Sequence, residues 1–357
     1  MINRQNSRYA VENSRNWRER FAEGQVIPAL PLALDDGGKY SECHERALVR
    51  YYRDAGAGGL AVGVHSTQFE IHDKGVGLYQ PVLELAAAVA EEKGDRAMVL
   101  IAGVIGGTGE ACREAALAKD LGYDAVLAGL TAFPDAPEAE LLEHLREVAS
   151  ILPVIGFYLQ DPVGGRFLSR DFWRVFAEIP GVAGVKIAPF NRYRTLDVIK
   201  GIEASGRTDI VLYTGNDDNI IPDLVTPING EGKEARFIRG GLLGQWGVWT
   251  SRACTLLERI KQERESGAIS LELLGQHVGL TECNAAIFDA VNAFAGVLPG
   301  IHYVLHKQGL MPGIRCLDPS LRLSPGQREA IDVAAGRYAF LCDDEFVEPR
   351  LADWLAD

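Results

Sequence analysis

The sequence predicts an α/β protein, a (β/α)8 TIM barrel with a C-terminal helical extension. Short apolar runs recur about every 30 residues, and a helical pattern follows each of them, which implies a parallel sheet. Eight such units within about 240 residues fit a closed barrel better than an open sheet. No Gly-x-Gly-x-x-Gly motif follows the first run, which disfavours a dinucleotide-binding sheet.

The predicted strands are short runs of apolar and β-branched residues bounded by turn residues. They cover residues 26–32, 59–64, 97–102, 123–128, 153–158, 182–187 and 209–213, with an eighth strand inside 236–247. Helical patterns connect them at residues 41–55, 81–92, 110–121, 137–150, 195–205 and 251–263. Ser41 is suited to cap the first of these helices.

After Ser270 the strand-like runs stop and only helical patterns follow, at residues 271–294, 299–308 and 324–338. We therefore expect three parts. They are a polar N-terminal arm (1–24), the barrel (25–265) and a C-terminal helical region (266–357).

The composition limits the possible partners. The 357 residues are 47% hydrophobic and 24% charged, which excludes global disorder. The formal net charge of -13 argues against nucleic acid and against an anionic membrane, because both attract a basic surface. The six cysteines show no metal-binding spacing, and no run approaches the roughly 20 apolar residues of a membrane span. Residues 1–24 lack the apolar core of a signal peptide, so we expect a cytoplasmic protein.

Lys186 lies inside an apolar run, at residues 181–188, that is typical of a buried strand. Burial disfavours the ammonium form and lowers the pKa of a lysine, and a neutral amine can attack a carbonyl to form a Schiff base. The alternative is a structural lysine that reaches solvent or pairs with a carboxylate. The run alone leaves both interpretations open.

Several polar residues follow the carboxyl ends of the predicted strands, where the chemistry of a barrel takes place. Ser66 and Thr67 follow the second strand, Tyr158 ends the fifth, and Gly215 follows the seventh. We expect Tyr158 and Lys186 to meet across the barrel mouth. The phenol would then move protons for a lysine imine.

Histidines and paired acids give weaker signals. His65 fits a substrate contact and a structural hydrogen bond equally well. His302 and His306 are four residues apart on a predicted helix, but the sequence shows no third ligand for a metal. Asp217 and Asp218 form an acidic pair of the kind that is usually solvated in loops. We predict no metal site.

Four ordered segments resemble motifs of the dihydrodipicolinate synthase / N-acetylneuraminate lyase superfamily, which comprises class I Schiff-base aldolases. The resemblance extends over residues 25–338. The family motifs are Gly-(Ser/Thr)-Thr-Gly-Glu, Pro-x-x-x-Tyr-Asn, Gly-(Ile/Val)-Lys and Ser-Gly-Asp-Asp. Their counterparts in this chain are GVHSTQ at 63–68, PVIGFY at 153–158, GVK at 184–186 and GNDD at 215–218.

The resemblance assigns roles to the residues that match these motifs. It implies that Lys186 forms the Schiff base and that Tyr158 is the catalytic tyrosine. Ser66 and Thr67 match the paired hydroxyls, which act in catalysis and hold the substrate carboxylate. We place His65 and Gly215 beside them as substrate-binding residues. The resemblance implies no cofactor, because the imine belongs to the protein itself, and it implies a homodimer or homotetramer.

The chain also departs from the family pattern. Gln68 and Phe69 replace the glycine and glutamate that follow the hydroxyl pair. Residues 130–134 offer no second tyrosine, and the loop after the tyrosine strand has no clear counterpart of the arginine that synthases place there. These differences predict a subgroup with a substrate of its own rather than dihydrodipicolinate synthase proper.

The sequence thus predicts a Schiff-base lyase or aldolase that makes or breaks a carbon–carbon bond in a 2-oxo acid such as pyruvate. A dehydratase or hydratase using the same lysine imine is the nearest alternative. A barrel that binds an oxo acid or a sugar acid without turnover is a second alternative, and a metal-dependent class II aldolase is a third.

Overall fold

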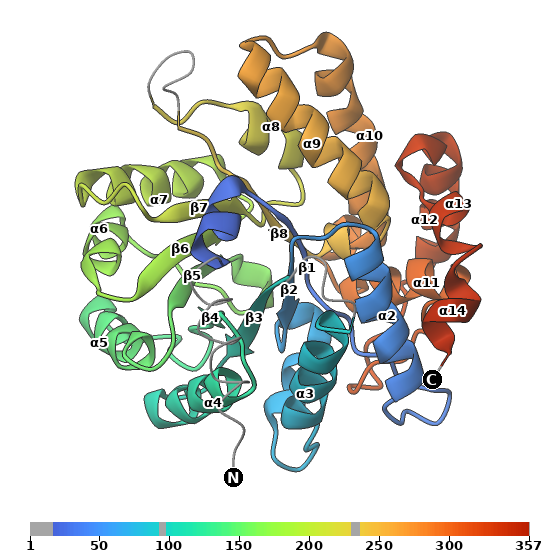
Figure 1. The fold of residues 1–357 in the computed structure, drawn as a ribbon, viewed down its shortest axis with the longest axis horizontal. Coiled ribbons are helices and arrows are strands. Elements are labelled where there is room, and N and C mark those ends of the chain that lie inside the picture. The colour runs from blue at the N-terminus through green and yellow to red at the C-terminus, as the bar shows by residue number, and fades with distance from the viewer. Residues whose placement is uncertain (1–16, 93–97, 230–235, 357) are drawn as a thin grey trace.

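The computed structural model describes residues 17–92, 98–229 and 236–356 of the chain. Within these ranges, eight parallel strands stand around a common axis and helices surround them (Figure 1). The strands are β1 (Val26–Pro28), β2 (Gly59–Val62), β3 (Val99–Val104), β4 (Ala125–Ala128), β5 (Val154–Leu159), β6 (Val182–Ala188), β7 (Val211–Thr214) and β8 (Gly240–Leu243).

The sheet closes on itself almost completely. Its hydrogen-bonded order is β1-β8-β7-β6-β5-β4-β3-β2, so each strand after the first lies beside the next one in the chain. A parallel bridge between Ala29 and Ala61 then joins the first two strands. The predicted (β/α)8 barrel is confirmed. The predicted third strand began at residue 97, which lies outside the described residues.

Helices alternate with the strands as predicted, although two of them, α6 and α8, were not identified from the sequence. The helices of the barrel are α2 (Glu42–Asp54), α3 (Tyr79–Ala90), α4 (Thr108–Asp120), α5 (Glu138–Ala149), α6 (Arg170–Glu178), α7 (Arg192–Ala204), α8 (Ile220–Val225) and α9 (Thr250–Ser266). Ser169 caps α6, because its hydroxyl accepts a hydrogen bond from the backbone N–H of Phe172 at 3.0 Å.

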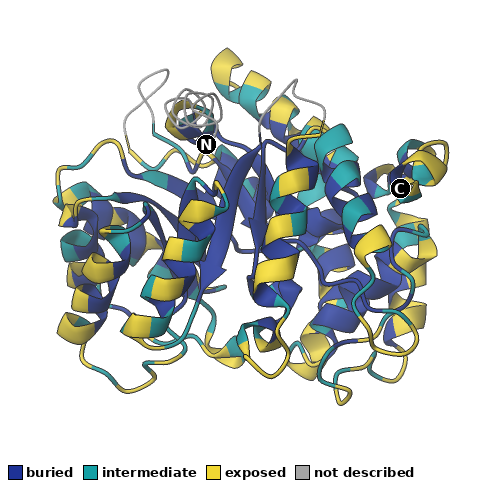
Figure 2. Cartoon of the chain, turned by 60° about the horizontal axis from the view of Figure 1, so that its bottom comes forward, coloured by how far each residue is buried: buried dark blue, intermediate teal, exposed yellow. Residues whose placement is uncertain are grey.

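Two apolar layers form the core, one inside the barrel and one between the strands and the helices. Figure 2 shows the strands almost entirely buried, while the helices expose their outer faces. Successive side chains of a strand point to opposite layers. In β5, Phe157 therefore belongs to the inner layer and Tyr158 to the outer layer.

Residues 17–23 form a helix that closes the amino-terminal end of the barrel. Trp17 and Phe21 are buried in the inner layer, and the ring of Phe21 stacks on Tyr213 with centroids 4.4 Å apart. The Tyr213 hydroxyl donates to the carbonyl of Phe21 and accepts from the N–H of Gln25. The last part of the predicted polar arm is thus packed against the barrel.

The C-terminal region is helical, as predicted, and lies along one side of the barrel (Figure 1). Its helices are α10 (Leu271–Ile287), α11 (Val297–Lys307), α12 (Gln327–Arg337), α13 (Asp344–Val347) and α14 (Leu351–Leu355). The predicted helix 271–294 is too long. Asp289, Ala293 and Phe294 have φ of 56°, 54° and 68°, and a right-handed helix cannot contain them.

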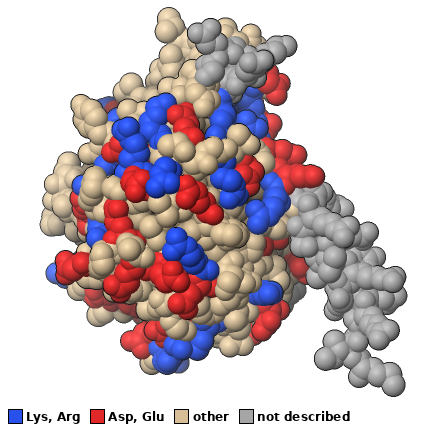
Figure 3. Space-filling model, turned by 90° about the vertical axis from the view of Figure 1, so that its left-hand side faces the viewer, with Lys and Arg blue, Asp and Glu red and all other residues tan. Residues whose placement is uncertain are grey.

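Basic and acidic side chains are interspersed on the face shown in Figure 3. Ion pairs there and elsewhere join neighbouring helices, such as Arg170 of α6 to Asp197 of α7 at 2.7 Å. Among the described residues, no helix has the length and apolar character needed to cross a membrane.

Candidate active site

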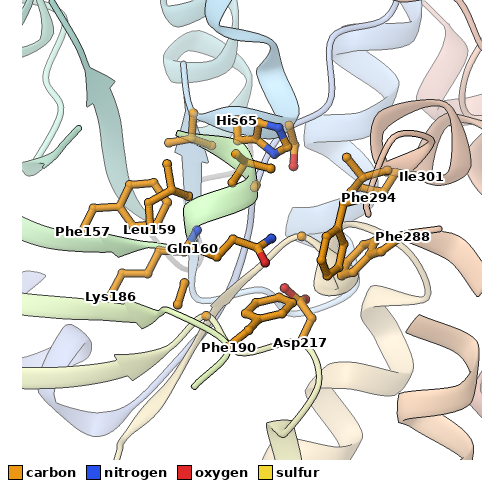
Figure 4. Close-up of a pocket in the computed structure, with 18 residues that line it drawn as sticks. His65, Phe157, Leu159, Gln160, Lys186, Phe190, Asp217, Phe288, Phe294 and Ile301 are labelled. Carbon is orange, nitrogen blue, oxygen red and sulfur yellow. The ribbon is translucent and has the colours of Figure 1, made fainter. Parts of the chain in front are cut away.

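Lys186 is the fifth of the seven residues of β6 and points to the mouth of the barrel. It is paired in register with Phe157 of β5 on one side and with Tyr213 of β7 on the other. The residue is 8% exposed, and all seven residues of the strand are buried, which confirms the buried strand predicted for this run. Its Nζ is 4.4 Å from the centroid of the Phe157 ring, and both residues line a pocket (Figure 4).

Asp217 is the charged partner of Lys186 in this pocket. Burial lowers the pKa of Lys186 below its ordinary value of 10.5, and the negative charge of Asp217 opposes part of that change. Burial likewise raises the pKa of Asp217 above its ordinary value of 3.8. The pKa values of the two groups are therefore closer together than those of a free lysine and a free aspartate, which favours proton exchange between them.

Contacts from two other elements hold Asp217 in place. Its Oδ1 accepts a hydrogen bond from the backbone N–H of Gln245, just after β8, at 3.0 Å. Its backbone carbonyl accepts a hydrogen bond from the side-chain amide of Asn284 in α10 at 2.7 Å. Asp217 is only 7% exposed. The expectation of a solvated acidic pair is therefore wrong for Asp217, which the structure buries on the pocket wall.

The paired hydroxyls after β2 are in different environments. Ser66 lines the pocket with Lys186, as expected of a substrate-binding group. The Thr67 hydroxyl instead donates to the carbonyl of Leu30 at 2.7 Å and accepts from the N–H of Gly63 at 3.0 Å. Thr67 is not among the residues of the pocket wall, and its hydroxyl connects the loop to the end of β1.

His65 and Gly215 both line the pocket beside Lys186, as predicted. Burial, and to a smaller extent the positive charge of Lys186, lower the pKa of His65 to about 4, so its ring is neutral at pH 7. A Cβ added at Gly215 would lie 2.8 Å from Cε of Lys186. The glycine therefore leaves the space in which the lysine side chain lies.

The structure does not bring Tyr158 and Lys186 together, so the expectation that they meet at the barrel mouth is wrong. Tyr158 follows Phe157 in β5 and therefore points to the opposite side of the sheet. Its ring packs on Trp173 of α6, with centroids 5.3 Å apart. Its hydroxyl accepts a hydrogen bond from the N–H of Leu168 at 3.3 Å.

Phe157 occupies the position that the motif gives to tyrosine. Pro-x-x-x-Tyr places the tyrosine four residues after the proline, and the residue four after Pro153 is Phe157. The alternation of side chains across β5 agrees with this count, because the ring of Phe157 lies beside Lys186. Counting from the proline would have identified the substitution in the sequence.

Aromatic residues that sequence analysis did not single out form much of the pocket wall. Phe190 follows β6, Phe288 follows α10, and Phe294 precedes α11. Gln160, just after β5, extends into the centre of the pocket (Figure 4). The sequence carried no clear signal for Phe288 and Phe294, because a continuous helix was predicted over residues 271–294. Among the described residues, no three His, Cys, Asp or Glu side chains are grouped as a metal site would require.

Comparison with known proteins identifies the family of this chain and relatives that share its fold. Residues 22–335 match the model of the dihydrodipicolinate synthetase family, which covers most of the chain. The chain belongs to this family. Members of the dihydrodipicolinate synthase / N-acetylneuraminate lyase superfamily are class I aldolases and lyases. This chain is an enzyme of that type.

The curated relatives in this family are 4-hydroxy-tetrahydrodipicolinate synthases. The protein of Thiobacillus denitrificans is 26% identical over 329 residues, which is 90% of this chain and 98% of that protein. The protein of Alkaliphilus oremlandii is 31% identical over 126 residues, covering 33% of this chain and 42% of its own length.

Solved structures of the family share the fold. N-acetylneuraminate lyase from Fusobacterium nucleatum aligns with a TM-score of 0.67 at 18% identity, over 88% of this chain and 99% of its own. A putative dihydrodipicolinate synthetase from Pseudomonas aeruginosa aligns with a TM-score of 0.69 at 16% identity, over 88% of this chain and 98% of its own.

Proposed function

We propose that the protein is a Schiff-base lyase or aldolase in which Lys186 forms an imine with the ketone of a 2-oxo acid such as pyruvate. The observation that carries this proposal is the position of Lys186, a lysine with a lowered pKa on the wall of a pocket at the barrel mouth. A neutral amine is the reactive form, and burial increases its fraction at pH 7.

The covalent steps need no group outside the protein. The Lys186 nitrogen attacks C2 of the substrate, the carbonyl oxygen leaves as water, and a protonated imine forms. When the bond between C3 and C4 of a 4-hydroxy-2-oxo acid breaks, its electron pair moves into the imine and an enamine results. The C4 hydroxyl loses its proton and becomes an aldehyde. Protonation at C3 and hydrolysis then release pyruvate and restore the amine.

Asp217 is the group we propose for proton transfer in these steps. The family's tyrosine position holds Phe157, and the hydroxyl of Tyr158 lies on the other side of β5. Asp217 lines the pocket, has a raised pKa and interacts electrostatically with Lys186. A carboxyl whose pKa approaches neutrality can both give and accept a proton.

Ser66 is the group we propose for the substrate carboxylate, since its hydroxyl side chain is on the pocket wall and can donate a hydrogen bond. His65 is beside it and neutral at pH 7, so it can donate one further hydrogen bond. The carboxylate would thus lie near Lys186, with the ketone directed at its amine.

The test is intact-mass spectrometry after borohydride reduction with a panel of 2-oxo acids, pyruvate first. We expect the wild-type protein to gain the mass of a reduced imine and Lys186→Ala to gain none. Lys200→Ala is the matched control, because Lys200 lies on α7 at the surface and pairs with Glu203. Its labelling should equal that of the wild type.

Three results would change the proposal. A protein that gains no adduct with any 2-oxo acid has no Schiff-base mechanism for these substrates. An adduct without bond cleavage or formation would favour the alternative of a barrel that binds an oxo acid without turnover. Loss of water from a 4-hydroxy-2-oxo acid, without an aldehyde product, would favour a dehydratase that uses the same imine.

We also propose that the enzyme works as a homodimer or homotetramer in the cytoplasm. Leu271, Leu274 and Val278 are exposed at i, i+3 and i+7 on α10, which gives this helix an apolar outer face. Cys43, Cys112, Cys283, Cys316 and Cys342 carry free thiols, as in a reducing compartment. Light scattering should give the mass of two or four chains. Val278→Asp should lower it, whereas Leu196→Asp on α7 should not.

A further inference from the structure

The pocket at Lys186 adjoins a second pocket that extends toward the C-terminal helices. Four residues line both of them, namely His65, Val163, Phe294 and Val297. A molecule bound to Lys186 could therefore extend past these residues into the second pocket. Pyruvate has only one carbon beyond its ketone and would leave this space unused.

Three phenylalanines form the wall on the side away from β5 (Figure 4). Phe190 and Phe294 meet edge to face, with ring centroids 5.7 Å apart and an interplanar angle of 81°. Phe288 lies beside Phe294 in the same wall. Edge-to-face aromatic pairs are favourable arrangements and leave a flat apolar surface for a further ring.

The backbone is strained at two of these residues. Phe190 has a φ of 49° and Phe294 a φ of 68°, in a region that bulky side chains rarely adopt. Each is held by hydrogen bonds, since the N–H of Phe190 donates to Oδ1 of Asn216 and the N–H of Phe294 donates to the carbonyl of Asp289. Strain that the surroundings maintain is typical of residues with a role at a site.

The charged residues of the two pockets also favour an uncharged distal group on the substrate. Among the described residues that line them, Lys186 is the only lysine or arginine. Glu70 adds a carboxylate to the second pocket. A second anionic group on the substrate would therefore be desolvated without a cation to compensate it, which is costly.

We propose that the substrate is a 2-oxo acid whose distal part is uncharged and apolar, such as an aromatic ring or a branched hydrocarbon, packed against Phe190, Phe288 and Phe294. This inference rests on the proposed function for the position of the ketone. The aldehyde released by cleavage, or accepted in condensation, is then an apolar aldehyde rather than a sugar or an acidic one.

The experiment compares three probes by borohydride trapping on the wild-type protein, namely pyruvate, 4-phenyl-2-oxobutanoate and 2-oxoglutarate. The phenyl probe should reach half-saturation at a concentration about tenfold lower than pyruvate, because it buries an extra ring. 2-Oxoglutarate should need a higher concentration than pyruvate, since its second carboxylate finds no cation.

Variants at two of the three phenylalanines test whether the phenyl probe binds to this apolar surface. Phe288→Ala and Phe294→Asn should raise the half-saturating concentration of the phenyl probe by roughly tenfold and that of pyruvate by a much smaller factor. Asparagine is chosen at residue 294 because it tolerates the positive φ. Phe167→Ala, at an exposed phenylalanine outside both pockets, is the matched control and should change neither value. Pyruvate trapping also reports that each variant is folded.

A final measurement separates this inference from the proposed function. 4-Phenylbutanoate has no ketone, so its calorimetric binding does not depend on an imine. If it binds and Phe294→Asn weakens it while no 2-oxo acid is trapped, the proposed function fails and the apolar subsite stands. If pyruvate is trapped but the phenyl probe is no better than 2-oxoglutarate, the inference on the substrate is overturned and the function stands.

Discussion

The Nζ of Lys186 lies 4.4 Å from the ring centroid of Phe157, its register partner on the adjacent strand. The face of an aromatic ring attracts an ammonium group, but it neither donates nor accepts a proton. The residue next to the proposed nucleophile thus stabilises charge without taking part in proton transfer. This relationship makes the origin of the proton the main mechanistic question for this protein.

Restoring a phenol beside Lys186 should compensate for the loss of Asp217. We expect Asp217→Asn still to form the imine, although more slowly, and to lower turnover by about 100-fold or more, within the usual contribution of acid–base catalysis. Adding Phe157→Tyr should recover part of that turnover, because the new hydroxyl lies near the imine. Steady-state rates of the single and double variants measure this. Equal rates with and without the tyrosine would contradict it.

Tyr158→Phe should change turnover by less than about threefold, a small effect for a group outside the pocket. The hydroxyl only accepts a hydrogen bond from the N–H of Leu168, at 3.3 Å on the outer side of β5. The measurement is kcat with the best 2-oxo acid of the trapping panel. A loss of 100-fold or more would return Tyr158 to the catalytic role that its sequence motif implies.

The pH dependence of imine formation should shift in Asp217→Asn. Only the neutral amine of Lys186 reacts, so the trapping rate rises with pH as the ammonium group loses its proton. The charge of Asp217 raises the pKa of Lys186, and its removal therefore lowers that pKa. The midpoint of the rise should move to lower pH in the variant. A midpoint that stays in place would show that the two groups do not interact.

Gly215→Ala should slow imine formation without unfolding the protein. Its new Cβ would lie 2.7 Å from Cβ of Ala188 and 2.8 Å from Cε of Lys186, so the lysine side chain must move. We expect trapping to fall by about tenfold or more, as for other displacements of a reacting group. Gly336→Ala in α12 is the control, because its added Cβ meets nothing within 4 Å. Trapping at the wild-type rate in Gly215→Ala would contradict this placement.

Tyr213→Phe should lower the free energy of unfolding by about 1–3 kcal/mol. The buried hydroxyl accepts from the N–H of Gln25 and donates to the carbonyl of Phe21, and both partners lose a hydrogen bond in the variant. Urea denaturation measures the change. Tyr193→Phe, at a tyrosine that is 82% exposed, should have almost no effect. Equal stability of both variants would indicate that the helix at residues 17–23 contributes little.

The predicted strands agree with the structure because their signal is local. A run of apolar residues bounded by glycine or proline predicts a buried strand wherever it lies, and Lys186 stands out in such a run. The error at Tyr158 arose from one step along β5, since a shift of one residue moves a side chain to the other face of the sheet. Asp217 was missed for a different reason. A loop aspartate is usually solvated, whereas this one is buried and receives hydrogen bonds from Gln245 and Asn284, which are distant in the sequence.

The sequence by itself determined the barrel, the position of Lys186 on a buried strand and the family. These depend on the periodicity of apolar residues and on short motifs, which are properties of neighbouring positions. Only the tertiary structure decided which groups surround the lysine. Asp217, in the loop after β7, lines the same pocket, and Phe288 and Phe294 reach it from the C-terminal region, more than 100 residues further along the chain than Lys186. Such contacts depend on how distant segments pack, because no local pattern specifies which side chains meet across a pocket.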